Sequence, residues 1–323
     1  MTPLLCAEGL TRSFAPRGLF RSGRAVVAVR GVNVTLQRGE ALGVVGESGC
    51  GKSTLGRLLL HLMPPTEGRV LFEGEDLATL SAARRRGLRR RMQMVFQDPY
   101  GSLDPRRTVG AQIADGPLIH GMADAAEARE QTAALLRQVG LEPSHATRLP
   151  HEFSGGQRQR IAVARALATK PDFIVADEPV SALDVSIQAQ IVNLLADLRQ
   201  ELGLALLFIS HDLHVVRHLC DRVMVMYLGR VVEEGPAADI FRSPSHPYTR
   251  ALLAATPSMH HRAKVAPLPG EVPSVANPPS GCVFRTRCPA ARPACAEAMP
   301  PLEPHPNRPQ RLIACWRAAE IDA

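Results

Sequence analysis

The eight residues from Gly46 to Ser53 limit most narrowly what this chain can fold into. They read GESGCGKS and fit the pattern G-x-x-x-x-G-K-S, in which glycines let consecutive backbone N–H groups curl around phosphate oxygens. The short apolar run LGVV precedes them, and the helix-forming run STLGRLLLHLM follows until Pro64 and Pro65 end it. Because a strand before and a helix after exclude a chance glycine turn, the sequence predicts a phosphate-binding loop in an α/β fold.

The end of this loop adds charge and a hydroxyl to the backbone cradle. Lys52 carries a full positive charge toward the β and γ phosphates of a nucleotide, and Ser53 offers a hydroxyl to Mg²⁺. The following helix directs the partial positive charge of its N-terminus at the same phosphates. Cys50 is a loop position to which we assign no redox role. The predicted nucleotide contacts are Gly46, Glu47, Ser48, Gly49, Cys50, Gly51, Lys52, Ser53 and Thr54.

A second apolar strand, FIVAD, ends in the carboxylates of Asp177 and Glu178. Asp177 can hold the Mg²⁺ shell, and Glu178 can polarise a water that attacks a phosphate. Phosphoryl transfer depends on positioning and charge neutralisation more than on covalent chemistry, and this pair supplies both. An apolar run ending in Asp-Glu is a weak signal alone, but downstream of a phosphate loop it is a strong one.

The order of the remaining segments predicts a parallel sheet covered by helices on both faces. A β-rich start with the alternating run AVVAVRGVNVTL leads into the loop, and a mostly helical region follows from about Asp98 to Leu149. There the run AEAREQTAALLRQVG closes at Gly140. A further helix, SIQAQIVNLLADLRQELG, ends at Gly203 before the strands ALLFIS and RVMVMY. Near Gly235 the composition shifts toward proline and cysteine, which predicts a separate small domain.

Composition narrows the setting of the protein. The 323 residues are 45% hydrophobic and 4% aromatic, which suits a large aliphatic core. No stretch reaches the roughly 18–20 uncharged apolar residues of a membrane-spanning helix, and the start has no basic leader, so we expect an intracellular chain that meets a membrane through a partner. Much of the net charge of +7 lies in an arginine run without interleaved aromatic residues, which favours a solvated helical face over a nucleic-acid surface. The run comprises Arg84, Arg85, Arg86, Arg89, Arg90 and Arg91.

Between the loop and the Asp-Glu strand lies the motif SGGQ, Ser154 to Gln157, which opens the helix-forming run RIAVARALA. Ser154 can cap that helix, and the two glycines expose N–H groups to an anion. In this position the motif resembles the signature of ABC transporter ATPases, which separates them from other P-loop enzymes. The resemblance covers residues 4–235, and no catalytic position departs from the family pattern. It implies a P-loop ABC ATPase core over residues 1–235, with an antiparallel β subdomain and an inserted helical subdomain at about 98–165.

The resemblance implies roles for further residues in binding and hydrolysing MgATP. Gln97 looks like the Q-loop glutamine, which contacts Mg²⁺ and senses the permease, and His211 looks like the switch histidine at the γ-phosphate. Phe14 is the expected adenine-stacking aromatic, with Phe20 as the alternative, and Asp184 ends the D-loop motif SALD. The implied catalytic residues are Glu178, His211 and Gln97, and the implied Mg²⁺ ligands are Ser53, Gln97 and Asp177. In this family, the signature of one subunit closes over the ATP of the other, so Ser154, Gly155, Gly156 and Gln157 are expected to touch the partner's nucleotide.

A narrower resemblance covers residues 236–323. The runs SPSHPYT and LPGEVPSVANPPSGCVFRTRCP look like the C-terminal region of ATPases from oligopeptide and dipeptide importers, and GESGCGKSTLGRLL with VFQDPYGSLDPR looks most like the F-type ATPase subunits of dipeptide permeases. This implies a heterodimer with a D-type ATPase, two membrane permease subunits and a peptide-binding protein outside the membrane. The chain would then be peripheral, on the cytoplasmic face of the inner membrane.

Two alternatives to peptide uptake stay open. Nickel importers share the same C-terminal region, so a nickel or other small-solute importer is the first. The second is a non-transport ABC ATPase of DNA repair or translation, which is disfavoured because the chain has neither a long coiled-coil insertion nor a second cassette. No nucleic-acid partner is expected.

Four of the seven cysteines cluster near the C-terminus with the spacing C-x5-C-x6-C-x19-C. Zinc sites usually begin with a tighter pair, whereas these wider gaps suit four thiolates around an iron–sulfur cluster. Related importer ATPases, which this region resembles, can carry a [4Fe-4S] cluster. The two hypotheses are such a cluster in a structural role and four reduced, partly buried thiols, at Cys282, Cys288, Cys295 and Cys315. Four histidines among prolines are expected at the surface: His246, His260, His261 and His305.

Overall fold

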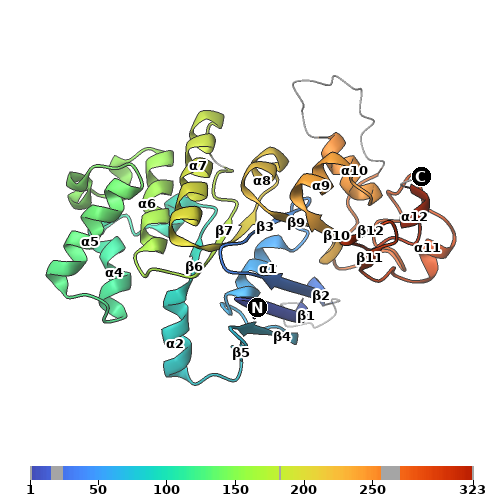
Figure 1. The fold of residues 1–323 in the computed structure, drawn as a ribbon, viewed down its shortest axis with the longest axis horizontal. Helices are drawn as coiled ribbons and strands as arrows, with labels where there is room; N and C mark the ends of the chain where they lie inside the picture. The colour runs from blue at the N-terminus through green and yellow to red at the C-terminus, as the bar shows by residue number, and fades with distance from the viewer. Residues whose placement is uncertain (1, 16–24, 182, 256–269, 322–323) are drawn as a thin grey trace. The chain divides into compact units, whose positions relative to one another are not determined.

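A computed structural model describes residues 2–15, 25–181, 183–255 and 270–321 (Figure 1). The chain divides into two compact units, each built from separated stretches of sequence. The first unit comprises Met1–Leu4, Leu36–Ala41 and Phe72–Ile209, and the second comprises Leu5–Thr35, Leu42–Leu71 and Ser210–Ala323. The two units are described in turn.

The first unit contains a short parallel sheet and half of the α-helices of the described residues. The strands of this unit are β5 (Glu75–Asp76), β6 (Met92–Val95), β7 (Phe173–Asp177) and β8 (Ala205–Ile209), of which β6, β7 and β8 form the parallel sheet. The α-helices of this unit are α2 (Ala82–Arg91), α3 (Pro99–Ser102), α4 (Val109–Ile119), α5 (Ala125–Gln138), α6 (Gly155–Leu167) and α7 (Val185–Leu202). Every residue of β7 and β8 is buried, as expected of a parallel strand with both faces covered. The pairing of Val95 with Ala176 places the carboxyl ends of β6 and β7 at the same edge of the sheet.

Helices α4, α5 and α6 pack side by side, and together with α3 they form the helical region that the sequence predicts (Figure 1). Asp124 begins α5 with a capping box, in which its carboxylate accepts from the backbone N–H of Glu127. Gly140, with a left-handed φ of 74°, closes the same helix. Gly203 closes α7 in the same conformation. Both helix ends fall at the glycines predicted from the sequence.

The second unit holds two sheets and the phosphate loop. Its strands are β1 (Leu5–Phe14), β2 (Val26–Leu36), β3 (Ala41–Val45), β4 (Glu67–Phe72), β9 (Arg222–Tyr227), β10 (Arg230–Pro236), β11 (Glu303–His305) and β12 (Arg308–Ile313), and its helices are α1 (Lys52–Leu59), α8 (Leu213–Leu219), α9 (Ala237–Arg242), α10 (Pro247–Ala254), α11 (Ala294–Glu297) and α12 (Ala318–Ile321). Strand β1 lies between β2 and β4. In the other sheet, β3 runs parallel to β9. Beyond β9 the strands lie in the order β9, β10, β12 and β11, and each strand is antiparallel to the next.

The predicted parallel sheet therefore holds only in part. The two-residue turn Leu228-Gly229, with φ values of 44° and 79°, joins β9 directly to β10. A turn this short forces the second strand to run antiparallel to the first. The sequence predicted no strands in the proline-rich C-terminal segment, yet β11 and β12 extend this sheet from there.

Helix α1 ends earlier than the run STLGRLLLHLM predicts. His61 adopts a left-handed φ of 50°. The N–H groups of His61 and Leu62 donate to the carbonyls of Leu58 and Arg57, each at 2.9 Å. This pair of bonds is a Schellman closure, so the prolines follow the end of the helix and do not cause it.

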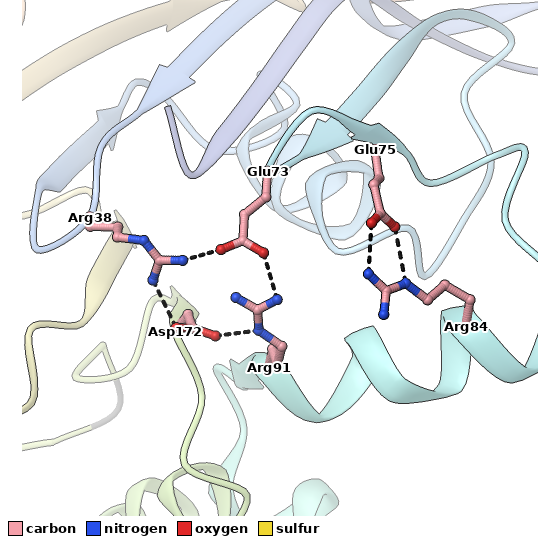
Figure 2. Close-up of polar contacts among 6 residues, drawn as sticks. All are labelled: Arg38, Glu73, Glu75, Arg84, Arg91 and Asp172. Atoms are coloured by element: carbon pink, nitrogen blue, oxygen red, sulfur yellow. Dashed lines mark hydrogen bonds and ion pairs between the residues drawn. The ribbon is translucent and has the colours of Figure 1, made fainter. Parts of the chain in front are cut away.

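The arginine run forms helix α2, and its last member is tied into an ion-pair network (Figure 2). Arg91 donates to Glu73 at 2.6 Å and to Asp172 at 2.5 Å, and Arg38 pairs with the same two carboxylates. The expected solvated face is therefore wrong for Arg91, whose side chain is only 23% exposed. Figure 2 also draws the neighbouring exposed pair of Glu75 and Arg84.

Two of the four histidines expected at the surface are buried. His246 and His305 are each 1% exposed, so this expectation is wrong for them. His246 begins α10, and its Nδ1 accepts from the backbone N–H of Tyr248 at 3.1 Å. Burial lowers the pKa of His246 to about 3, so the ring is neutral near pH 7. His260 and His261 lie outside the described residues. Within the described ranges, no helix has the length and apolarity needed to span a bilayer.

Candidate nucleotide-binding site

The predicted phosphate loop connects β3 to α1 in the second unit, and its backbone requires glycine. Gly46, Gly49 and Gly51 have φ values of 151°, 77° and 107°, which L-residues with side chains rarely adopt. A Cβ at Gly46 would lie 2.2 Å from the Met226 carbonyl oxygen, and one at Gly51 would lie 2.1 Å from the Ala28 carbonyl oxygen. The loop is therefore packed closely against β9 and β2.

Lys52 is the first residue of α1 and is only 4% exposed. Its Nζ donates to the carbonyl oxygens of Gly46 at 2.8 Å and Glu47 at 3.1 Å, so the ammonium is held by the loop itself. The N-cap residue of α1 is Gly51, which has no side chain to cap the first turn. One loop thus brings together backbone N–H groups, a helix N-terminus and a buried ammonium, which are the groups that bind phosphates in proteins.

Cys50 lies within the loop and is buried. Burial raises the pKa of its thiol, although the nearby Lys52 opposes the shift. The thiol form is therefore favoured at neutral pH, and the thiolate is the reactive form of cysteine. This supports the expectation that Cys50 has no redox role.

In the first unit, parallel pairing brings the predicted Q-loop glutamine close to the predicted catalytic carboxylate. Gln97 follows β6, and Glu178 follows β7. Gln97 Nε2 donates to Glu178 Oε2 at 3.0 Å. Asp177, the last residue of β7, is 3% exposed. Gln97 and Glu178 are 81 positions apart in the sequence, yet they meet at one edge of the sheet, as expected of residues predicted to share one site.

Glu178 has an unusual backbone conformation. Its φ is 45°, in the left-handed region that residues other than glycine seldom occupy. The N–H of Glu178 donates to the Ile209 carbonyl at 2.9 Å, and the Ser181 N–H donates to the Glu178 carbonyl at 3.3 Å. Such conformations persist where surrounding structure over-determines them, and they cluster at functional sites.

The signature residues begin helix α6 as the sequence predicts. Ser154 Oγ accepts from the Gln157 N–H at 3.3 Å, and Gln157 Oε1 accepts from the Ser154 N–H at 3.0 Å, which forms a capping box. A Cβ at Gly155 would lie 3.3 Å from Leu183, and one at Gly156 would lie 2.5 Å from Ile187. Glycine at the second position is therefore required to let α6 and the start of α7 approach closely.

The remaining predicted residues are divided between the units. Asp184 precedes α7 in the first unit, and Ala182 of the same motif lies outside the described residues. His211 is exposed at the turn before α8 in the second unit. Phe14 ends β1 there, is 38% exposed and has the Arg12 guanidinium 5.0 Å from its ring centre. The alternative, Phe20, lies outside the described residues.

The predicted Mg²⁺ ligands have suitable chemistry. Ser53, Gln97 and Asp177 supply a hydroxyl, an amide oxygen and a carboxylate, which are the hard oxygen donors that this cation prefers. The carboxylate of Asp177 belongs to a buried residue, as expected of a group that is neutralised by a cation. Ser53 belongs to the second unit, and the other two belong to the first.

The four clustered cysteines line one pocket of the second unit, together with His246, Phe284 and Trp316. Burial raises the pKa of the Cys282 and Cys288 thiols, and it raises that of Cys315 to about 11. Within the described residues, no three His, Cys, Asp or Glu side chains are grouped to hold a single metal ion. The thiols therefore converge on one pocket without forming a site for one ion.

Sequence reasoning missed two residues that touch the phosphate loop. Tyr248 Oη accepts from the Glu47 N–H at 2.9 Å, and Arg287 pairs with the Glu47 carboxylate at 2.8 Å. They lie 201 and 240 residues along the chain from Glu47, so no local pattern connects them to it. Tyr248 lies inside the recognised run SPSHPYT and Arg287 inside LPGEVPSVANPPSGCVFRTRCP, and these runs were the signals that pointed to their neighbourhoods.

Two family profiles match the chain. The profile described as ABC transporter matches residues 29–181, which include the loop, the signature and the Asp-Glu pair. The profile described as the C-terminal region of oligopeptide/dipeptide transporters matches residues 232–295.

Curated relatives match along nearly the whole chain. A Brucella ovis protein is 54% identical over 318 residues, which cover 98% of both chains. The oligopeptide transport ATP-binding protein AppF of Bacillus subtilis is 52% identical and covers 92% of each chain. The dipeptide transport ATP-binding protein DppF of Haemophilus influenzae is 49% identical, over 98% of this chain and 97% of that one.

Solved structures share the fold. The ATP-binding cassette MJ0796, a dimer in a post-hydrolysis state with ADP and Pi, is 30% identical with a TM-score of 0.65, over 72% of this chain and 98% of that one. The cbiO1 protein of Clostridium perfringens, part of an ABC transporter complex, is 29% identical with a TM-score of 0.66, over 75% and 92%. The fold that the sequence predicted is therefore confirmed for the cassette.

Proposed function

Because the chain belongs to the family of ABC transporter ATPases, we propose that it is the ATP-hydrolysing subunit of a peptide importer and powers uptake of dipeptides or oligopeptides across the inner membrane. One observation carries this proposal. The similarity to AppF and DppF runs through the C-terminal region as well as the cassette, and that region also matches the profile of oligopeptide/dipeptide transporters.

We assign nucleotide binding to residues 46–54, with Phe14 stacking on adenine. The buried Lys52 ammonium would exchange its contacts with the loop carbonyls for the β and γ phosphate oxygens. Ser53, Gln97 and Asp177 would hold Mg²⁺, which when bound neutralises charge on those phosphates. The donor chemistry of these three side chains supports the assignment.

We assign hydrolysis to Glu178, which would orient the attacking water and accept its proton. Its hydrogen bond from Gln97 supports this role, because an oriented carboxylate is a better general base than a freely rotating one. His211 would stabilise charge on the γ-phosphate. Gln97 would contact Mg²⁺ as well, which makes it the link between the cation and the base.

We place the second half of each ATP site on a partner ATPase. The signature residues Ser154 to Gln157, with Asp184, would cover the nucleotide of the partner. The backbone N–H groups at the start of α6 support an anion-binding role for this turn. The dimeric state of MJ0796 supports pairing of two cassettes. The finer proposal is a heterodimer with a D-type subunit.

The same proposal implies further subunits of the transporter. Two membrane permease subunits would receive the motion of the ATPase pair, and a peptide-binding protein would deliver cargo from outside. The chain would act at the cytoplasmic face of the inner membrane as a peripheral subunit. We further propose that residues 1–235 form the nucleotide-binding domain, with a helical subdomain at about 98–165, and that residues 236–323 form the importer-type C-terminal domain.

For the cysteine pocket we propose a structural [4Fe-4S] cluster. Its support is that four thiols line one pocket in a partly buried setting. A four-iron cluster is also larger than one ion, so its thiolates need not converge as closely as zinc ligands do. Anaerobic purification of the full chain, with iron and acid-labile sulfide assays, tests this. Material that lacks both iron and sulfide would leave the reduced-thiol hypothesis in its place.

Uptake by a deletion strain tests the transport function. Cells without the gene are expected to lose uptake of labelled dipeptide or oligopeptide while keeping nickel uptake, and the wild-type gene should restore it. A matched strain that expresses Glu178→Gln should not. Loss of nickel uptake with intact peptide uptake would replace the proposed cargo with the nickel alternative.

A further inference from the structure

The second residue of the phosphate loop is held from two directions by the C-terminal segment. Arg287 donates from Nη1 to Glu47 Oε2 at 2.8 Å and from Nη2 to Glu47 Oε1 at 3.1 Å, a two-bond pair. Tyr248 Oη accepts from the Glu47 backbone N–H at 2.9 Å. Both the side chain and the main chain of Glu47 are therefore fixed by residues outside the cassette motifs.

Most of this contact is buried, although the Glu47 side chain is 25% exposed. Arg287 is 6% exposed, Tyr248 is fully buried, and the Arg287 Nη1 lies 3.5 Å from Tyr227 Oη. The Tyr227, Tyr248 and Phe284 rings pack against one another with centroids 4.7–5.3 Å apart. A two-bond arginine–carboxylate pair is directional, and removal of Arg287 would leave the partly buried Glu47 carboxylate without its cation.

The Arg287–Glu47 pair also reduces electrostatic repulsion between Glu47 and bound phosphates. A carboxylate directly after the first glycine of a phosphate loop would repel the phosphates that the loop binds. The Arg287 guanidinium neutralises this carboxylate at the loop, and the bond to Tyr248 fixes the peptide that precedes Glu47. The Gly46 and Glu47 carbonyls both accept from Lys52 Nζ, so the held peptide positions the ammonium as well.

We propose that Arg287 and Tyr248 are positioning residues that hold the phosphate loop in its ATP-binding shape, so that the affinity for ATP depends on the C-terminal segment. Arg287 lies between Cys282 and Cys288, and Phe284 of the same turn packs on Tyr248. A change in the cysteine pocket would therefore be transmitted to the phosphate loop through Arg287 and Tyr248. The inference rests on the proposed assignment of residues 46–53 to phosphate binding.

The test measures binding of a fluorescent ATP analogue to full-length variants that retain the wild-type circular dichroism spectrum. Arg287→Gln, which leaves the Glu47 carboxylate unpaired, should weaken binding about tenfold, the size of one lost charge-assisted pair. Tyr248→Phe keeps the ring in its stack and removes only the acceptor, so it should weaken binding about threefold. In the full transporter, KM for ATP should rise more than kcat falls.

A second-site variant separates positioning from general damage. Adding Glu47→Gln to Arg287→Gln removes the unpaired charge, so the double variant should bind ATP more tightly than Arg287→Gln alone. Arg285→Gln is the matched control, because Arg285 lies on the same turn but bonds Ser280 instead of the loop. It should bind ATP like the wild type.

The possible outcomes distinguish this inference from the proposed function. If Lys52→Ala binds ATP normally, the loop assignment itself fails. If Lys52→Ala loses ATP while Arg287→Gln and Tyr248→Phe bind like the wild type, only the positioning role is overturned. A double variant no tighter than Arg287→Gln also overturns it. Should Arg287→Gln not fold, Tyr248→Phe decides the matter alone.

Discussion

Gln97 and Glu178 are joined by a hydrogen bond of 3.0 Å between Nε2 and Oε2, across the edge where strands β6 and β7 end. The bond is a consequence of parallel pairing, because two strands in register deliver the residues after their carboxyl ends to the same place. The bond lets Gln97, which we propose as the sensor of the permease, help to orient Glu178, the proposed base. Movement of the Q-loop would therefore reach hydrolysis through a single side-chain contact.

The first prediction concerns this contact. Gln97→Ala should lower kcat about tenfold with Glu178 still present, because the carboxylate loses a hydrogen-bond donor and Mg²⁺ would lose one of its proposed ligands. Steady-state ATPase assays of the assembled transporter measure the change. Gln93→Ala is the control, since the Gln93 amide donates to the Arg89 carbonyl within its own segment and should leave kcat unchanged. Equal effects of the two variants would argue against the orienting role.

The second prediction concerns the base itself. Glu178→Gln should reduce hydrolysis by a factor of about 10² or more, because an amide does not accept the proton of the attacking water. Binding of ATP should persist, and the variant should accumulate with its partner ATPase as a closed, ATP-bound pair. Size-exclusion chromatography with labelled ATP detects that species. A variant that turns over ATP at a near-normal rate would remove Glu178 from the mechanism.

The third prediction concerns the fit of the loop. Gly51→Ala should unfold the loop or abolish ATP binding, because the new Cβ would lie 2.1 Å from the Ala28 carbonyl and the φ of 107° is strained for alanine. Gly87→Ala is the matched control. Gly87 lies in helix α2 with open space around it, so alanine should raise the free energy of unfolding by about 0.5–1 kcal/mol. Thermal melting and ATP binding of both variants check the pair.

The features that were predictable from the sequence are those set by local chemistry. The glycines of the phosphate loop, the Ser154 cap and the helix stops at Gly140 and Gly203 each follow from φ requirements or capping within a few residues. Each appears in the structure where the sequence placed it. Buried strands were equally predictable from apolar runs such as FIVAD that are bounded by polar residues.

The features that were missed depend on contacts between distant residues. His246 looked exposed among prolines, yet its ring is buried because its segment packs against Phe284, whose ring lies 5.8 Å away. The pairing of Arg287 with Glu47 joins residues 240 positions apart. Arg91 resembled its solvated neighbours in the arginine run, and only its position at the end of α2, directly before β6, brings it to Asp172. Composition and spacing carry no information about such partners.

The fourth prediction is a loss of stability in acid that originates in the ion-pair network of Figure 2. The hydrogen bond from Arg91 holds the pKa of Glu73 below its ordinary value of 4.5. Burial raises the pKa of Asp172, but hydrogen bonds from Arg91 and Arg38 outweigh it and leave that pKa below 3.8. Below these ordinary values the unfolded chain binds protons that the folded chain does not, so falling pH favours unfolding. The contribution is fully present at neutral pH and is lost as the pH falls from about 5.

Urea unfolding of the wild type and of Asp172→Asn at pH 7 and near pH 4 measures this contribution. At pH 7 the variant should be less stable by about 1 kcal/mol, because two arginines lose a charged partner in a partly exposed setting. Near pH 4 the difference should shrink, since the unfolded wild-type chain begins to bind a proton at Asp172 that the folded chain does not. Glu8→Gln is the control: the Glu8–Arg69 pair has both side chains about half exposed, and such pairs contribute little. A difference between wild type and Asp172→Asn that stays constant from pH 7 to pH 4 would mean that packing around Asp172, and not its charge, stabilises the fold.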